Sequence, residues 1–413
     1  MTLFSSISSC YQELVHSFLK NPLPTPVYLY SETQLKQNAG TFIRFRDQHG
    51  IQAYYAMKAN SNPSIINLFY RSGIFIDANS LGEITMALKA GVQPDHILFS
   101  GVGKTRDEIT AAIQLKIHAI KIESVGEAAL IGQITDALKQ SVNVSLRLNP
   151  EIDPKTHPYI STGVRESKFG IDHQDLPSVT EVLSAHPRLK LTSLSAHIGS
   201  QIFDVGLYID VYKNLAHYAD HFRREGFPIT ELDLGGGFGI RYNASGETVA
   251  DEMDKVFADL VELNQGKYKL CIEPGRMLVA NSCILTGTVL YTKRNGDKHF
   301  VVTDASMTEN IRPALYQAEH PIMVFSESAE GESLVADIVG PVCESGDFLG
   351  EQVSIRSASP GDFIGVFDSG AYTMSMASNY NLRPLAAEYL LSDGKWVCIR
   401  KRQTIEEMIN RGL

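Results

Sequence analysis

Short, apolar, β-rich stretches recur eight times along the first two thirds of the chain. They lie at residues 53–57, 74–77, 97–100, 119–122, 143–148, 192–197, 230–234 and 269–272. Amphipathic helical patterns fill the gaps between them. Parallel strands need long crossover connections, usually helices, so this alternation predicts a closed parallel (β/α)8 barrel with its helices outside.

Three of the predicted helices begin with a capping box, in which a hydroxyl and a Glu three residues later satisfy the first free backbone N–H groups. The boxes are Ser80 with Glu83, Thr105 with Glu108, and Ser124 with Glu127. They support the positions at which these helices follow their strands.

The pattern changes after Arg276. Asn295-Gly296 and Asp393-Gly394 each lie between two alternating strand patterns, which is typical of β-hairpins. We therefore expect an α/β fold: a TIM-like (β/α)8 barrel at residues 34–276 and a C-terminal antiparallel β-sandwich or barrel domain at 277–413. Residues 1–33, including the strand pattern VYLYS near Val27, are expected to join the β domain.

The composition of the chain excludes some classes of binding partner. The chain has 413 residues, with 37 Lys and Arg against 47 Asp and Glu, for a formal net charge of −10. An acidic surface argues against nucleic acid or an anionic membrane as partner. No apolar run approaches the ~18 residues that cross a bilayer, and residues 1–20 lack the pattern of a signal peptide. The five cysteines are scattered without the spacing of a zinc site, so we expect no metal and a reduced, cytoplasmic location.

Reactive side chains follow four of the predicted barrel strands, at the end where barrel active sites form. They are Lys58 after the first strand, His197 and Ser200 after the sixth, Gly235, Gly236 and Gly237 after the seventh, and Glu273 and Arg276 after the eighth.

This set of residue types predicts chemistry that uses pyridoxal phosphate (PLP). A lysine amine forms a Schiff base with the aldehyde, and glycine N–H groups hold the phosphate. A carboxylate keeps the pyridine nitrogen protonated, so that the ring accepts electrons from a breaking bond, and an imidazole stacks on the ring.

Each residue also has an ordinary structural explanation. Lys58 alone is typical of a solvated surface lysine, and His197 of a core histidine. The glycines alone suit a tight strand–helix turn, and Glu273 with Arg276 suits a loop salt bridge. Only their shared position at one rim favours the functional interpretation.

The motifs YYAMKAN, HIGSQI, DLGGGFG, EPGR and CESGD together resemble the fold type III, alanine-racemase-fold decarboxylases that use PLP. The resemblance covers nearly the whole chain. Within that family, five further motifs are most similar to diaminopimelate decarboxylases: FSGVGKT at 99–105, HPYISTG at 157–163, KFGI at 168–171, IRPALYQA at 311–318 and SNYNLRP at 378–384. Gln317 stands where relatives frequently carry glycine.

The resemblance implies roles for individual residues. Lys58 is the Schiff-base lysine and Cys343 the catalytic proton donor. The implied cofactor-binding residues are Lys58, Asp77, His197, Ser200, Gly235, Gly236, Gly237, Glu273, Gly275, Arg276 and Tyr372. The implied substrate-binding residues are Arg276, Arg312, Tyr316, Glu344 and Tyr372.

The implied reaction is decarboxylation of meso-2,6-diaminopimelate to L-lysine and CO2, the last step of lysine biosynthesis. Arg312 suits a bidentate grip on the distal carboxylate and Glu344 the distal ammonium; a structural ion pair is the ordinary alternative for Arg312. The family also implies a homodimer in which Cys343 and Glu344 complete the partner's site.

Other readings stay open. One is a decarboxylase of the same fold acting on ornithine, lysine, arginine or a D-amino acid. A racemase, a non-catalytic PLP-binding homologue and a phosphate-binding barrel without PLP are weaker alternatives.

Overall fold

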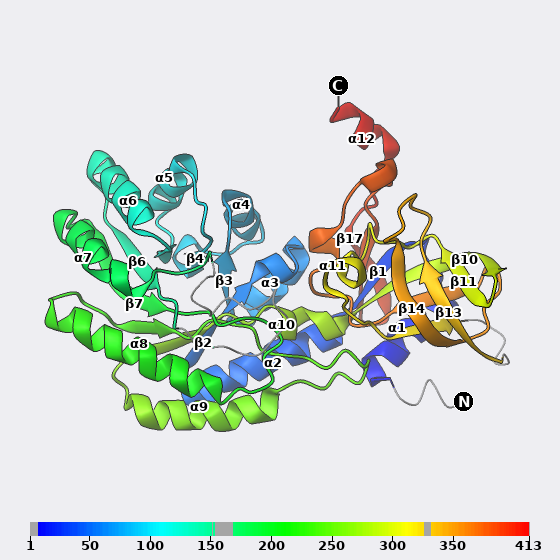
Figure 1. The fold of residues 1–413 in the computed structure, drawn as a ribbon, viewed down its shortest axis with the longest axis horizontal. Helices are drawn as coiled ribbons and strands as arrows, with labels where there is room; N and C mark the ends of the chain where they lie inside the picture. The colour runs from blue at the N-terminus through cyan, green and yellow to red at the C-terminus, as the bar shows by residue number, and fades with distance from the viewer. Residues whose placement is uncertain (1–6, 151, 153–167, 326–331, 413) are drawn as a thin grey trace. The chain divides into compact units, whose positions relative to one another are not determined.

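The computed structural model describes residues 7–150, 152, 168–325 and 332–412 (Figure 1). The predicted motif at 157–163 lies outside them. The chain forms two compact units. The barrel unit comprises Asn38–Gly239 and Thr248–Gly275, and the β unit comprises Met1–Gln37, Ile240–Glu247 and Arg276–Leu413. The short segment Ile240–Glu247 thus belongs to the β unit although barrel sequence surrounds it, which the sequence pattern did not indicate.

The barrel unit contains a closed barrel of parallel strands, as predicted. Each strand pairs with the next along the chain, and the last pairs with the first. Among the described residues its strands are β2 (Ile51–Ala56), β3 (Phe75–Ala78), β4 (Ile97–Phe99), β5 (Ala119–Ile122), β6 (Val142–Arg147), β7 (Leu189–Ser195), β8 (Glu231–Asp233) and β9 (Lys269–Ile272). All eight predicted stretches are confirmed as strands. Their residues are mostly buried because both faces of the barrel wall are covered.

The barrel helices lie between the strands along the chain. They are α3 (Pro63–Arg71), α4 (Leu81–Lys89), α5 (Arg106–Leu115), α6 (Val125–Leu138), α7 (Leu176–Ala185), α8 (Leu207–Arg224) and α9 (Ala250–Asn264), preceded by α2 (Glu32–His49). Thr105 and Glu108 form the complete predicted capping box. Ser80 and Ser124 also cap their helices. Their paired glutamates instead accept the N–H of the residue before the cap, Asn79 and Glu123.

The β unit is built on a mainly antiparallel sheet. Its strands are β1 (Val27–Ser31), β10 (Cys283–Asn295), β11 (Lys298–Thr303), β12 (Ile322–Phe325), β13 (Ser333–Val339), β14 (Phe348–Arg356), β15 (Phe363–Val366), β16 (Ala387–Ser392) and β17 (Lys395–Arg400). Its helices are α1 (Ser9–Lys20), α10 (Arg276–Val279), α11 (Arg312–Tyr316) and α12 (Ile405–Asn410). β1 lies between β10 and β16, so the N-terminal strand is part of this sheet. Two pairs, β1 with β16 and β11 with β13, are parallel.

Both predicted hairpins are present. The second turns at Asp393 and Gly394, where φ is 47° and 72°. The first turns one residue later than expected: Asn295 still pairs with Lys298, which leaves Gly296 (φ 60°) and Asp297 in the turn. Glycine relieves the strain of a positive φ at that first turn position.

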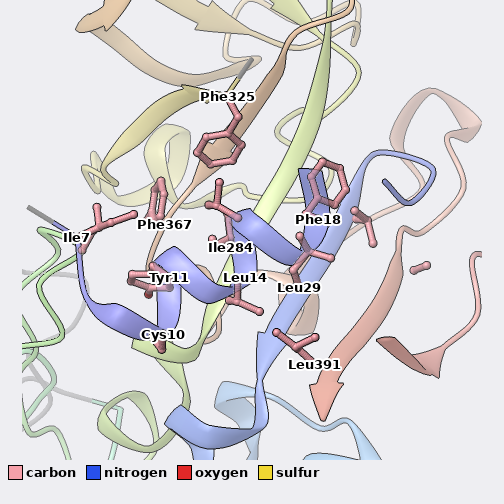
Figure 2. Close-up of a cluster of buried hydrophobic side chains, with 14 residues drawn as sticks. Ile7, Cys10, Tyr11, Leu14, Phe18, Leu29, Ile284, Phe325, Phe367 and Leu391 are labelled. Carbon is pink, nitrogen blue, oxygen red and sulfur yellow. The ribbon is translucent and has the colours of Figure 1, made fainter. Parts of the chain in front are cut away.

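Helix α1 supplies much of the β unit's core. Tyr11, Leu14 and Phe18 are fully buried and point from one face of α1 toward the sheet (Figure 2). Phe18 meets Phe363 edge to face, with ring centroids 4.9 Å apart. The Tyr11 hydroxyl donates to Asp368 at 2.7 Å. The amphipathic N-terminal pattern is therefore an integral part of this core.

Candidate active site

Lys58 lies in a one-turn 3-10 helix (Met57–Ala59) directly after β2. Its side chain is exposed, whereas the residues on either side are buried. The end of β2 is tied to the loop after β9, because the Ala56 N–H donates to the Pro274 carbonyl oxygen at 3.0 Å. Gly275 packs against the same strand end, where an added Cβ would lie 3.3 Å from Ala56. The amine therefore projects from a well-anchored turn.

A cluster of buried charges lies beside this turn inside the barrel. Lys121 of β5 donates to Asp233 at 2.6 Å and also to the carboxylate of Glu273. Asp77 of β3 accepts a hydrogen bond from the Ser100 hydroxyl. All three acids and the lysine are buried, so water screens their charges little.

Burial and mutual repulsion shift the pKa values of this cluster. Burial raises the pKa of Asp77 to about 7, and the Glu273 charge contributes in the same direction. Burial and Asp233 also raise the pKa of Glu273, against the opposing effect of Lys121. Burial disfavours the charged form of Lys121, but the neighbouring carboxylates outweigh it and raise the pKa of that ammonium. Lys121 thus pairs directly with two of the three acids, and the charges of Lys58 and Arg147 also act on the cluster. The pKa values of Asp77 and Glu273 are raised nonetheless, so the site would accommodate further positive charge.

His197 follows β7 and is held as a neutral ring. The Gly236 N–H donates to His197 Nδ1 at 3.1 Å, so the ring proton is on Nε2. Burial lowers the pKa of His197 well below its ordinary value, and the positive charges of Lys58, Arg147 and Lys121 lower it further. The Lys58 charge also acts on Asp77, which brings the predicted residues Lys58, Asp77 and His197 together.

The three consecutive glycines after β8 are required by close backbone packing. A Cβ added at Gly235 would lie 2.3 Å from the Ala196 carbonyl oxygen. A Cβ added at Gly236 would lie 1.9 Å from the Glu273 carbonyl oxygen, and one added at Gly237 would lie 2.0 Å from the Gly199 carbonyl oxygen. The tight-turn explanation therefore accounts for the motif without any ligand.

One amide of the glycine turn remains available to an anion. The Gly235 N–H donates to Asp233 Oδ1 at 2.9 Å, and that of Gly236 is used by His197. Within the described part of the chain, the Gly237 N–H has no acceptor. Gly237 packs against Gly199, the neighbour of the half-buried Ser200. The turn can therefore offer one backbone donor next to a serine.

A second group of predicted residues gathers within the β unit. Arg276 is the first residue of α10, and its guanidinium donates to the Tyr242 hydroxyl at 2.6 Å. It also lies over the ring of Tyr372, 4.9 Å from the centroid. Tyr372 has φ +58°, a strained backbone conformation for a non-glycine residue. Tyr242 lies in the short segment Ile240–Glu247 and was not among the predicted site residues.

Arg312, at the start of α11, belongs to the same group. Its side chain is buried, lies 4.6 Å from the centroid of the Tyr242 ring and donates to His320 Nε2 at 2.6 Å. No carboxylate of the described residues lies within ion-pair distance of it. The structural ion pair considered for Arg312 is therefore absent from the described residues. Tyr316, at the other end of this short helix, is half-buried.

Cys343 and Glu344 lie on an exposed but well-anchored loop of the β unit. The buried Asp347 accepts the N–H groups of Met307 and Val342, each at 2.7 Å. The Cys343 N–H donates to the Asn381 side chain at 2.8 Å. The predicted thiol and carboxylate are thus presented at the surface of this unit with a fixed backbone.

Four residues of these clusters were missed by the sequence analysis. Lys121 could have been recognised from the sequence, since a lysine within an apolar barrel strand needs a buried partner. Asp233 was part of a recognised motif but received no role. Tyr242 and His320 gave no local signal, because their partners are far away in the sequence or across a turn.

The sequence is similar to those of known proteins. Residues 36–280 match the family "Pyridoxal-dependent decarboxylase, pyridoxal binding domain". A diaminopimelate decarboxylase of Aquifex aeolicus is 38% identical over 391 residues, 94% of this chain and 92% of the relative.

The chain belongs to the pyridoxal-dependent decarboxylase family, in its diaminopimelate decarboxylase branch.

Solved members of this branch share the fold. A crystal structure of the Helicobacter pylori diaminopimelate decarboxylase with L-lysine superposes with a TM-score of 0.88 at 37% identity, covering 96% of this chain and 100% of that one. A crystal structure of the diaminopimelate decarboxylase of M. jannaschii with L-lysine gives a TM-score of 0.87 at 33% identity. The match covers 96% of this chain and 94% of that one. The predicted fold and family are therefore confirmed.

The cofactor of this pyridoxal-dependent decarboxylase is pyridoxal 5′-phosphate. The barrel residues fit it: an exposed amine at Lys58, an excess of buried carboxylates for a protonated ring nitrogen, and an unused amide at Gly237 for a phosphate oxygen. The described residues contain no cluster of His, Cys, Asp and Glu suited to a metal ion, and no helix among them is long and apolar enough to cross a membrane.

Proposed function

We propose that this decarboxylase converts meso-2,6-diaminopimelate into L-lysine and CO2, the final step of lysine biosynthesis. The observation that carries the choice of substrate is the buried Arg312, whose guanidinium has no carboxylate partner among the described residues. The charge of Asp368 acts on Arg312 only through space, because no carboxylate of the described residues lies within ion-pair distance of the guanidinium. A buried cation without a directly paired carboxylate is costly, so it favours a ligand that retains a carboxylate after CO2 has left. Relatives that are named diaminopimelate decarboxylases support the same substrate.

The barrel residues hold the cofactor in this proposal. When bound, pyridoxal phosphate supplies an electron sink for the bond that breaks at the substrate Cα. Lys58 would hold its aldehyde, Glu273 would keep its ring nitrogen protonated, and Gly237 with Ser200 would bind its phosphate. His197, neutral and aligned by Gly236, would pack against the ring.

The remaining residues of the proposed site act on the substrate. Arg312, with Arg276 and Tyr316, binds the carboxylate that stays behind, and Glu344 binds the ammonium beside it. Tyr372 contacts both phosphate and substrate. Cys343 gives a proton to Cα after CO2 has departed.

We also propose a homodimer in which Cys343 and Glu344 act in the partner's site. Their exposure on an anchored loop supports this arrangement. Mixing two inactive variants, Lys58→Ala and Cys343→Ala, should restore about one quarter of the wild-type activity, since random pairing leaves one intact site in half of the dimers. Mixtures that stay inactive after subunit exchange would show that both residues serve the same chain.

The substrate is tested by measuring CO2 release from meso-diaminopimelate beside ornithine, lysine, arginine and a D-amino acid. Release from meso-diaminopimelate alone is expected. Faster release from another substrate would transfer the function to that amino acid. Lys58→Ala should abolish both turnover and the absorbance that arises from the link between this lysine and the cofactor, and normal turnover in this variant would refute the mechanism.

Five free cysteines in the described residues agree with the reduced cytoplasm that we propose as the location of the enzyme.

A further inference from the structure

Arg312 is oriented by a histidine that the proposed mechanism does not use. His320 lies in the loop before β12 and is buried. Its Nε2 is 2.6 Å from an Nη of Arg312, and its Nδ1 is 2.8 Å from the Phe367 carbonyl oxygen. Both ring nitrogens are therefore occupied by partners of the same unit.

These two contacts determine the protonation of the ring. A guanidinium only donates, so Nε2 must accept, and the ring proton must be on Nδ1, where it points at the carbonyl of Phe367. Burial, together with the charges of Arg312 and Arg276, lowers the pKa of His320 to about 3. The histidine is therefore a neutral acceptor for Arg312 throughout the physiological pH range.

The backbone on the far side of His320 is fixed. The Phe367 N–H donates to the Pro321 carbonyl oxygen at 2.9 Å, so His320–Pro321 and Phe367 are joined by two reciprocal hydrogen bonds. The next residue, Asp368, accepts from the Tyr11 hydroxyl at 2.7 Å and from the Ala244 N–H at 3.0 Å. Arg312 is thus held against a part of the core that has little freedom to move.

Tyr242 confines the guanidinium on another side. Its ring lies 4.6 Å from the Arg312 guanidinium carbon and 5.0 Å from the His320 ring, nearly perpendicular to the latter. His320 uses one of the five N–H groups that an arginine offers. Two of the remaining N–H groups, side by side on the guanidinium, have the geometry that binds the two oxygens of a carboxylate.

We infer that His320 is a positioning residue, which orients Arg312 so that its guanidinium grips the substrate carboxylate that is not lost. The inference rests on the proposed function, because it assigns that carboxylate to Arg312. It goes beyond that function by adding a residue that touches neither substrate nor cofactor and determines how well the enzyme distinguishes ligands with and without this carboxylate.

The test compares two amines that differ in that carboxylate. L-Lysine and 1,5-diaminopentane are titrated into cofactor-loaded enzyme, and binding is followed through the cofactor absorbance. His320→Leu should weaken L-lysine about ten-fold, the effect of one misaligned charged hydrogen bond, and leave 1,5-diaminopentane unchanged. His320→Gln, whose amide oxygen can accept from Arg312, should recover most of the loss. Glu319→Gln, an exposed neighbour, is the matched control and should bind both amines as the wild type does.

Three results would overturn the inference. One is an equal loss for both amines in His320→Leu, which would indicate a purely structural role. Another is a His320→Leu variant that still prefers L-lysine as strongly as the wild type. A third is an Arg312→Met variant that keeps this preference, because the carboxylate would then bind elsewhere. Failure of the wild type to decarboxylate meso-diaminopimelate would refute the proposed function alone, since the binding comparison needs no turnover.

Discussion

The raised pKa of Asp77 makes a direct prediction about stability and pH. This side chain is buried in the barrel, beside Glu273 and the Ser100 hydroxyl, and its pKa is raised from 3.8 to about 7. We consider Asp77→Asn in the cofactor-free protein. Asparagine keeps the size of the side chain and an oxygen that can accept from Ser100, but it carries no titratable charge.

The direction in which stability changes with pH follows from proton binding. Because the pKa of Asp77 is higher in the folded state, the native protein binds a proton that the unfolded chain releases as the pH rises through that interval. The stabilisation is complete below the unfolded value of 3.8 and is lost as the pH rises through about 7. At ~1.36 kcal/mol per pH unit, the total change is about 4 kcal/mol, of which about 2 to 3 kcal/mol falls between pH 5 and pH 8.

The assay is urea unfolding of wild type and variant at pH 5 and pH 8, followed by circular dichroism. Acids that do not interact with Asp77 titrate equally in both proteins, so the difference between the two proteins reports Asp77 together with its coupling to Glu273 and Lys121. The Asp77→Asn variant should gain stability relative to the wild type as the pH rises. Asp95→Asn, an exposed aspartate, is the control and should follow the wild type. Parallel pH dependence of wild type and Asp77→Asn would refute the reasoning.

The other predictions concern packing and buried charge. Gly236→Ala places a Cβ 1.9 Å from the Glu273 carbonyl oxygen and should weaken cofactor binding in an absorbance titration. The control Gly126→Ala has open space around its Cβ and should bind the cofactor as the wild type does. Equal cofactor affinity of the two variants would contradict this prediction. Lys121→Met leaves buried carboxylates uncompensated and should cost about 3–5 kcal/mol of unfolding free energy, more at pH 8 than at pH 5; a pH-independent loss would argue against it. Phe18→Ala should cost about 3–5 kcal/mol in urea unfolding, and a loss below 1 kcal/mol would show that α1 contributes little to the core.

Much of the barrel could be predicted from local patterns. Apolar stretches bounded by turn residues and N-caps mark strands and helices through short-range physics, and a (β/α)8 order leaves few alternative topologies. The positions of Lys58 and Glu273 just after barrel strands could be predicted for the same reason, since the pattern identifies the strands that precede them.

The networks behind these residues could not be predicted in this way. Lys121 meets Asp233 and Glu273 across 112 and 152 residues of sequence, and only barrel closure brings them together. The place of Tyr242 in the β unit depends on a short segment that interrupts the barrel sequence. Hydrogen-bond partners of this kind follow from tertiary structure and leave no periodic signal.

Gln317 illustrates how a family comparison can gain a physical meaning. The sequence resemblance implies a glycine here, and Gln317 has φ +53° at the C-cap of α11, the short helix that begins with Arg312. A left-handed C-cap favours glycine, so this chain accepts some backbone strain next to Tyr316.

Carboxylates predominate around Lys121 in the barrel, whereas two arginines lie around Tyr242 in the β unit, and this pattern fits the proposed chemistry. In the barrel, one lysine faces three carboxylates, two of which have raised pKa values. In the β unit, Arg312 is buried against a neutral histidine and a tyrosine. Structural ion pairs would cancel their charges within each cluster, since uncompensated buried charge destabilises the fold. The excess acid instead suits a protonated cofactor ring, and the excess base suits a substrate carboxylate. The barrel should therefore gain stability when the cofactor binds, and the Arg312 cluster should gain stability only when an amino acid that retains its carboxylate is present.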